Sequence, residues 1–357
     1  MKKLSILTYG AGAIGTYMGG SLVLAGHKVV FIEQPEPAAE LMNRGMKLDL
    51  SRYELWDSDQ PIGLPSSNFY CASSLEEALD QGPFDAVIFA LKSFDTESAL
   101  EGMKPFIKQM PPVLCFQNGV ENEVKLKEVL GNEKVLTGTT TSSVGRLGVG
   151  NIILERLRGV GIATDCDPVL KPLAQKLVEA MNEANLNATL FERGLDMKWS
   201  KMLTNLLGNA TAAILDMTPA QVFQHRKLFA FEMGMLREAL EVMDAQGIHP
   251  VKLPKVPVSL LTFAVRNLPG FVIRPLLVKM VGSGRGAKMP SFHIDLHAGR
   301  KRIEVDYLNG AVVRAGQKAG VPTPINRLLN DTLQDLVNGN QAITDYSHKP
   351  EKLLALL

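Results

Sequence analysis

Three polar side chains interrupt an otherwise apolar segment in the second half of the chain. Lys201, Asn205 and Asn209 recur at steps of four within residues 199–209, WSKMLTNLLGN. In a helix each step of four turns about 40° around the axis, so the three side chains form one narrow stripe on a buried helix. Buried polar groups cost stability unless they find partners or line a wet cavity. Structural hydrogen bonds are one explanation of the stripe, but they seldom need a lysine, so Lys201 is our candidate proton donor.

A second misplaced polar group is Glu304, which would share a helical face with Leu308, Ala311 and Ala315. A carboxylate on that face needs a cation, and the simplest partner is Lys201, whose charge and orientation Glu304 would then set. The alternative is a surface glutamate at a helix start, where acidic residues are favoured. We predict a catalytic pair, Lys201 and Glu304.

Near the N-terminus a glycine motif stands between an expected strand, Leu4 to Thr8, and an expected helix. The segment reads Tyr9-Gly10-Ala11-Gly12-Ala13-Ile14-Gly15. In a G-x-G-x-x-G motif the first glycine allows a tight turn, the second lets the backbone approach a pyrophosphate, and the third lets the helix pack against the strand. A glycine-rich structural turn is the alternative reading. We assign a cofactor-binding role to Gly10, Ala11, Gly12, Ala13, Ile14 and Gly15.

Glu33 ends the second expected strand, His27 to Ile32, at the position from which an acid binds the cofactor ribose. Its carboxylate would accept hydrogen bonds from a free 2′-hydroxyl and repel the 2′-phosphate of NADP. Taken alone, Glu33 favours NAD(H). The alternative is a solvated glutamate at the end of a strand.

Polar residues also follow two later strands of the expected sheet. Lys92 comes after Asp85 to Leu91, and Asn118 comes after Val113 to Phe116. Ligands of open α/β sheets bind beyond the carboxyl ends of strands, so both residues are expected near the nicotinamide. A solvated loop lysine and an Asn-Gly turn remain the alternatives.

The order of elements predicts the fold class. In the first half, short apolar strands alternate with helices, which is typical of a Rossmann-type doubly wound α/β sheet. Further strands are expected between Gly145 and Ala163, and the apolar spacing from Gly194 onward is helical, including one helix from Leu195 to Leu215. We therefore predict a dinucleotide-binding domain over residues 1–192 and an all-α substrate and catalytic domain over residues 193–357.

Composition restricts the function further. The chain has 357 residues, and a formal net charge of +1 provides no field to gather nucleic acid, so we expect no nucleic-acid partner. Its 3 cysteines are widely spaced and odd in number, which indicates a reduced protein. The N-terminal segment lacks the apolar run of a secretory signal, so we expect a cytoplasmic location.

The most apolar stretch, Val256 to Gly282, is interrupted by prolines and charged residues in every window of about 20 residues. We expect buried or cleft-covering helices there and no membrane segment. The sequence leaves open whether the protein forms a homodimer.

His293 and His297 have the i, i+4 spacing of a metal-binding pair. Because no third ligand is visible in the sequence, we predict no metal.

Together these motifs resemble the ketopantoate reductase family, from about residue 4 to residue 330. The resemblance rests on the glycine motif and on six further segments in the family's order. These are Leu91-Lys92-Ser93, Gln117-Asn118-Gly119, Gly138-Thr139-Thr140-Thr141, Trp199-Ser200-Lys201 with Asn205 and Asn209, Pro290-Ser291, and the run from Glu304 to Gly310.

The resemblance implies reduction of 2-dehydropantoate to pantoate with a hydride from NADP(H). It also implies that Lys201 protonates the carbonyl oxygen as general acid and that Glu304 holds the substrate hydroxyl and the lysine. Asn205, Asn209 and Ser291 would hydrogen-bond the substrate. Asn118 and Lys92 would lie between the cofactor and the substrate carboxylate.

Two departures from the family pattern bear on specificity. Gln34 stands where the family usually carries an arginine for the 2′-phosphate, which places NADPH preference in doubt. The chain is also longer than a typical member between His249 and Met289, with Arg285-Gly286-Ala287-Lys288 just before Ser291. Another small 2-oxo acid is therefore an alternative substrate, and a dinucleotide-binding sensor without turnover is an alternative from a different class.

Overall fold

The computed structural model describes residues 2–284 and 289–357, and the chain forms two compact units. Unit 1 comprises Met1–Gln117, Glu121–Met197 and Leu253–Val256. Unit 2 comprises Asn118–Val120, Lys198–Lys252 and Pro257–Leu357.

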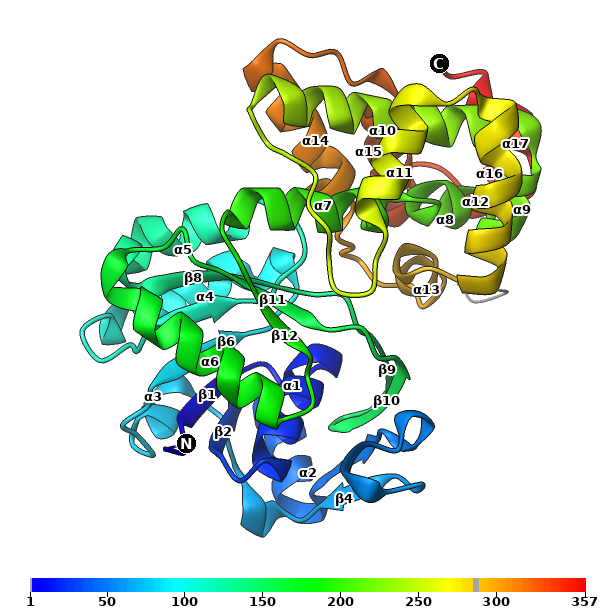
Figure 1. The fold of residues 1–357 in the computed structure, drawn as a ribbon. Helices are drawn as coiled ribbons and strands as arrows, with labels where there is room; N and C mark the ends of the chain where they lie inside the picture. The colour runs from blue at the N-terminus through cyan, green and yellow to red at the C-terminus, as the bar shows by residue number, and fades with distance from the viewer. Residues whose placement is uncertain (1, 285–288) are drawn as a thin grey trace. The chain divides into compact units, whose positions relative to one another are not determined.

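Unit 1 is built on an eight-stranded sheet with the order β12-β11-β8-β7-β6-β1-β2-β5 (Figure 1). The six strands from β8 to β5 are parallel, and β11 is antiparallel to β8. Because the chain leaves β1 toward β2 and later returns to β6 on its other side, the strand order reverses at β1, where such sheets bind ligands. The strands are β1 (Ser5–Tyr9), β2 (Lys28–Ile32), β5 (Tyr70–Ala72), β6 (Ala86–Phe89), β7 (Val113–Cys115), β8 (Val135–Thr140), β11 (Val160–Ala163) and β12 (Ala188–Phe191).

Helices cover both faces of this sheet because its strands are apolar on both sides. Ile6 and Ile88 belong to the core with α1 (Ala13–Leu24) and α6 (Lys171–Glu183). Leu7, which follows Ile6 in β1, and Val87, which precedes Ile88 in β6, belong to the core on the opposite face. Residues of three helices complete that second core: α3 (Leu75–Leu79), α4 (Thr96–Met103) and α5 (Asn122–Leu130). The predicted doubly wound α/β fold is confirmed.

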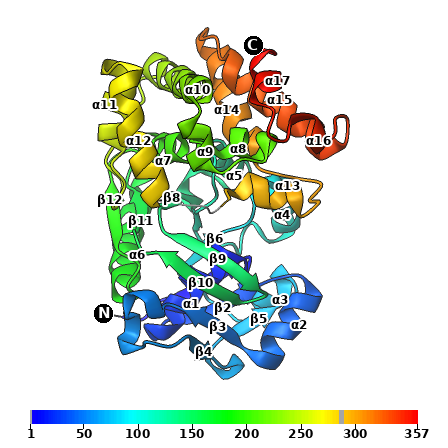
Figure 2. The same cartoon turned by 90° about the vertical axis from the view of Figure 1, so that its right-hand side faces the viewer.

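A second sheet of four strands, with the order β4-β3-β10-β9, packs on α1 (Figure 2). A Cβ atom on Gly20 of α1 would lie 2.6 Å from the end of the Leu48 side chain, so a larger residue would require Leu48 to shift. The strands predicted after Gly145 exist, but two of them form this separate sheet, which the sequence analysis did not predict. Its strands are β3 (Met46–Asp49), β4 (Ile62–Leu64), β9 (Ser143–Gly148) and β10 (Asn151–Arg156).

The remaining elements of unit 1 are the helix α2 and seven short 3₁₀ turns. They are α2 (Pro35–Arg44), η1 (Ser51–Tyr53), η2 (Leu55–Asp57), η3 (Ser66–Asn68), η4 (Ser93–Asp95), η5 (Lys104–Phe106), η6 (Asn132–Lys134) and η7 (Pro168–Leu170).

The regular elements of unit 2, among its described residues, are all helices, as predicted. The helix α7 (Gly194–Leu206) begins in unit 1 and continues into unit 2. The other helices are α8 (Asn209–Leu215), α9 (Pro219–Gln224), α10 (Arg226–Ala245), α11 (Val258–Asn267), α12 (Gly270–Gly284), α13 (Ser291–His297), α14 (Val305–Ala319), α15 (Pro324–Asn338), α16 (Ile343–Tyr346) and α17 (Pro350–Leu354).

The prediction of one helix from Leu195 to Leu215 is wrong, because the chain leaves the helical conformation at Gly208. Gly208 has φ +61°, a left-handed conformation that ends α7 and that glycine adopts without strain. The buried Glu232 carboxylate of α10 accepts a hydrogen bond from the Gly208 N–H at 2.7 Å and another from the Thr211 hydroxyl. Asn209 is therefore the first residue of α8, and the argument for a single polar stripe does not hold for it.

The long apolar stretch forms α11 and α12. None of the helices in the described ranges is long and apolar enough to cross a membrane. Of the two expectations, buried or cleft-covering helices, full burial does not hold for α11, which buries Leu261 and Val265 but leaves Leu260 54% and Phe263 56% exposed. The predicted feature Arg285–Lys288 lies outside the described residues.

Candidate functional site

The glycine motif forms the turn between β1 and α1. The N–H of Gly10 (φ +98°) donates to the Ile32 carbonyl oxygen at 3.0 Å. A Cβ atom on Gly15 would lie 1.8 Å from the Gly10 carbonyl oxygen, so α1 packs directly on the turn. A Cβ atom on Gly12 would have no neighbour within 4 Å. The loop is thus tightly packed except at Gly12, where its backbone faces open space.

The N-terminus of α1 begins at Ala13, with Gly12 as its N-cap. It has no capping side-chain hydrogen bond and no acidic residue in its first turn. Free N–H groups at a helix N-terminus attract anions such as a pyrophosphate.

Glu33 lies beside this loop. Its Oε2 accepts a hydrogen bond from the Ala11 N–H and its Oε1 one from the Gln34 N–H, each at 3.0 Å. Gln34 is exposed, and the first turn of the following helix carries another acid, Glu36. A dinucleotide fits these residues, since the open backbone at Gly12 can approach a pyrophosphate and the Glu33 carboxylate can accept from a ribose hydroxyl.

A buried polar network ties together the ends of β6 and β7. The Gln117 Nε2 donates to the Lys92 carbonyl oxygen at 3.1 Å and to the Thr96 Oγ1 at 2.9 Å. Thr96 donates to the Ser93 carbonyl oxygen at 2.8 Å, and the Asn122 Nδ2 donates to the Ser93 Oγ at 3.2 Å. The network fixes the backbone from which Lys92 projects.

Lys92 could be picked out from the sequence, but Thr96 and Asn122 could not be recognised there as members of this network. Both are fully or almost fully buried, at 0% and 1% exposure. A polar residue at the first position of the helix after each strand end was the available signal, and it is weak because polar residues at helix starts are usually caps.

In unit 2, Asn118 and Asn205 are brought together. The Asn205 Nδ2 donates to the Asn118 Oδ1 at 3.2 Å, although the two residues are far apart in sequence. Lys201 is half-buried on α7, one helical turn before Asn205. The lysine thus projects from the same face of α7 as a hydrogen-bonded amide pair.

Asn209 contacts a different segment of unit 2. It is 5% exposed, and its Oδ1 accepts a hydrogen bond from the Phe292 N–H at 3.2 Å. Phe292 is the second residue of α13, directly after Ser291, whose side chain is exposed. Asn209 therefore holds the start of the helix that carries Ser291.

Glu304 stands at the N-cap position of α14 and is 4% exposed, so the alternative of a surface glutamate is wrong.

The helix α14, which follows Glu304, is anchored by a buried network. The Asn309 Nδ2 donates to the Asn326 Oδ1 at 3.1 Å, and the Asn326 N–H donates to Glu238 at 2.9 Å. Burial raises the pKa of Glu238 above its usual range. These contacts fix α14 and the position of Glu304 within unit 2.

Comparison with known proteins places this architecture in one family. A family model described as ketopantoate reductase PanE/ApbA matches residues 6–163, and the model of that family's C-terminal part matches residues 195–337. The 2-dehydropantoate 2-reductase of Streptococcus pyogenes serotype M3 is 26% identical over 261 residues, which covers 72% of this chain and 76% of the relative.

Solved structures share the fold. A PanE/ApbA family ketopantoate reductase from Ralstonia eutropha JMP134 has a TM-score of 0.76 at 23% identity, covering 95% of this chain and 100% of the other. A ternary structure of D-mandelate dehydrogenase with NADH and anilino(oxo)acetate has a TM-score of 0.75 at 21% identity, covering 94% and 99%. With both family models matched in order over most of its length, the chain belongs to the ketopantoate reductase family, a family of NAD(P)-dependent oxidoreductases.

Proposed function

We propose that this protein reduces 2-dehydropantoate to pantoate and uses Lys201 as general acid. The observation that carries the proposal is the half-buried Lys201 one turn before the Asn205–Asn118 hydrogen bond, in a chain whose relatives are named 2-dehydropantoate 2-reductase. A half-buried ammonium beside these amides is placed to donate a proton to the carbonyl oxygen of a bound substrate.

The proposed roles follow from the charge that develops on the substrate. When bound, the nicotinamide supplies a hydride to the carbonyl carbon. The carbonyl oxygen then gains negative charge, which the Lys201 ammonium stabilises and neutralises by giving up its proton. The buried Glu304 carboxylate would hold the substrate hydroxyl and orient Lys201.

Amide and hydroxyl groups would hold the rest of the substrate. Asn118, Asn205, Asn209 and Ser291 are its proposed hydrogen-bonding residues. Lys92 and Asn118 would also bind the cofactor.

We further propose that NADH is preferred over NADPH. The Glu33 carboxylate lies beside the glycine loop, and Gln34 and Glu36 follow it in place of a cation. A 2′-phosphate near these acids would be repelled.

A second candidate is the reduction of another small 2-oxo acid. The segment that forms α11 and α12 favours it, because the resemblance implies that this segment is longer than in a typical family member. The same fold occurs in D-mandelate dehydrogenase, whose structure holds NADH and anilino(oxo)acetate, so the fold alone does not decide which 2-oxo acid is used.

A substrate panel tests the proposal. The purified full chain is assayed with 2-dehydropantoate, 2-oxoisovalerate and phenylglyoxylate, each with NADH and NADPH, by following nicotinamide absorbance. We expect the highest kcat/KM for 2-dehydropantoate with NADH. A preference of about tenfold or more for another acid would establish the second candidate. Cofactor binding without turnover of any acid would indicate a non-catalytic sensor.

A further inference from the structure

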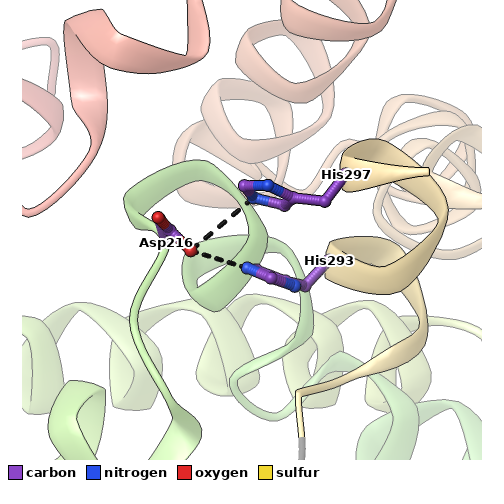
Figure 3. A group of neighbouring side chains, drawn as sticks. All are labelled: Asp216, His293 and His297. Atoms are coloured by element: carbon purple, nitrogen blue, oxygen red, sulfur yellow. Dashed lines mark hydrogen bonds and ion pairs between the residues drawn. The ribbon is translucent and has the colours of Figure 1, made fainter. Parts of the chain in front are cut away.

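A carboxylate and two imidazoles converge in unit 2, on residues with no role in the proposed reaction (Figure 3). Asp216 is the C-cap of α8, with φ +52°. His293 and His297 lie one turn apart on α13. The Asp216 Oδ1 is 2.7 Å from the His293 Nε2 and 3.6 Å from the His297 Nε2.

Hydrogen bonding accounts for only one of the two histidines. The His293 distance is a normal hydrogen bond, whereas 3.6 Å between Asp216 and His297 exceeds the hydrogen-bond range. The two rings are stacked, with centroids 3.9 Å apart and planes 22° apart, and both point toward the same carboxylate (Figure 3). A shared cation would give both ring nitrogens and the carboxylate a common partner.

The spacing suits a small divalent ion. One ligand atom from each of the three residues lies within 4.8 Å of the others. Zinc sits about 2.0–2.2 Å from nitrogen and oxygen ligands, which places neighbouring ligands of a tetrahedral site roughly 3.3 Å apart. The two Asp216–histidine distances, 2.7 and 3.6 Å, lie on either side of that value.

The side chains of the cluster are partly open to solvent. The hydrogen bond from His293 lowers the pKa of Asp216, and burial lowers the pKa of His297. Metals bind an ionised carboxylate and a neutral imidazole. The side chains of His293, His297 and Asp216 are 12%, 33% and 34% exposed, so an ion can enter. The Ser347 Oγ donates to the other Asp216 oxygen at 3.3 Å and orients the carboxylate.

We propose that Asp216, His293 and His297 bind one first-row divalent transition-metal ion, Zn²⁺ in the first place, with water completing the coordination. Two imidazoles and one carboxylate suit Zn²⁺ or Co²⁺ better than Mg²⁺ or Ca²⁺, which prefer oxygen ligands alone. The ion links the C-terminus of α8 to α13.

The consequence for the site rests on the proposed function. Asn209 at the start of α8 already holds the first turn of α13 through the Phe292 N–H. A metal at the other end of α8 fixes α13 at a second point and so fixes Ser291. We expect metal to lower KM for 2-dehydropantoate and to leave kcat nearly unchanged.

The test titrates the chelator-treated full chain with Zn²⁺ and with Co²⁺, using calorimetry for Zn²⁺, visible absorption for Co²⁺ and thermal melting for both. Wild-type protein is expected to bind one ion per chain, with a higher Tm and a Co²⁺ spectrum of a nitrogen and oxygen site. The variants Asp216→Asn, His293→Gln and His297→Gln should each weaken the affinity at least tenfold. His249→Gln, which removes an exposed histidine that is not part of the cluster, should not change it.

Metal-free melting curves show whether each variant is folded. If His293→Gln does not fold, the comparison uses His297→Gln, whose side chain is more exposed. No saturable binding, or equal affinity in wild type and the cluster variants, overturns the proposal. Metal binding is measured without substrate, so its result does not depend on whether the protein catalyses the proposed reaction.

Discussion

The Glu33 carboxylate accepts a hydrogen bond from the Ala11 N–H at 3.0 Å and so joins the end of β2 to the glycine loop. The contact holds a negative charge beside the loop that is proposed to bind the dinucleotide. We therefore expect cofactor preference to depend on Glu33 and on its exposed neighbour, Gln34.

Replacing Glu33 and Gln34 together tests this link. Glu33→Gln/Gln34→Arg removes the repulsion of a 2′-phosphate and adds a cation for it, so kcat/KM with NADPH should rise about tenfold or more while kcat/KM with NADH falls. Gln60→Arg, at another exposed position of unit 1, is the control and should change neither value. A wild-type protein that already prefers NADPH contradicts the account.

Gly12 and Gly15 should respond differently to the same small change. Gly12→Ala places a methyl group in open space, so Tm should stay unchanged. Dinucleotide affinity should fall at least about tenfold, because the methyl group occupies the side of the loop that the pyrophosphate would approach. Gly15→Ala places it against the Gly10 carbonyl oxygen and should cost about 1–3 kcal/mol of unfolding free energy. Urea unfolding and NADH fluorescence titration measure the two effects. Equal effects of the two variants on stability would refute this division of roles.

Glu232 should stabilise the break between α7 and α8. Glu232→Ala leaves the Gly208 N–H and the Thr211 hydroxyl without their buried acceptor, which should cost about 2–3 kcal/mol or more. Glu241→Ala, at an exposed position of the same helix, is the matched control and should cost less than about 0.5 kcal/mol. Urea unfolding followed by circular dichroism makes the comparison, and similar losses in both variants would show that the buried acceptor is dispensable.

His27 should make stability depend on pH. Its Nδ1 accepts the Leu4 N–H at 3.0 Å, and burial, reinforced by the charge of Lys3, lowers its pKa below the usual 6.5. Below that pH the unfolded chain binds a proton that the folded chain does not, so the free energy of unfolding falls as pH falls from 6.5 toward the folded-state pKa.

The measurement is urea unfolding at about pH 7.5 and about pH 5.5. His27→Asn, which can keep an acceptor for Leu4, should lose less stability between the two values than wild type. Equal losses would mean that His27 does not titrate as inferred.

The sequence predicted the parts of the fold that depend on local patterns. Strands β1 and β2 and the intervening helix follow from apolar periodicity and from a glycine motif with a steric reason for each glycine. The second sheet escaped prediction because β3 and β4 are only 4 and 3 residues long, and β3 pairs with β10 about a hundred positions away.

Polar positions were easier to identify than their surroundings. Lys201 and Glu304 stood out as polar groups in apolar patterns, but the burial of Glu304 became evident only in the folded chain. The helix break at Gly208 was hidden by a continuous apolar run. Likewise, the third group beside His293 and His297 is Asp216, 77 positions before His293, a distance over which spacing carries no information.

The most direct test of the central claim is the turnover of Lys201→Ala with 2-dehydropantoate and NADH, next to Lys252→Ala, which removes an exposed lysine of the same unit. The account predicts that kcat of Lys201→Ala falls about 100- to 10,000-fold, the usual contribution of a general acid, while the NADH dissociation constant stays the same. Lys252→Ala should match wild type. A Lys201→Ala enzyme within a few-fold of the wild-type kcat would contradict the assignment of Lys201 as the proton donor.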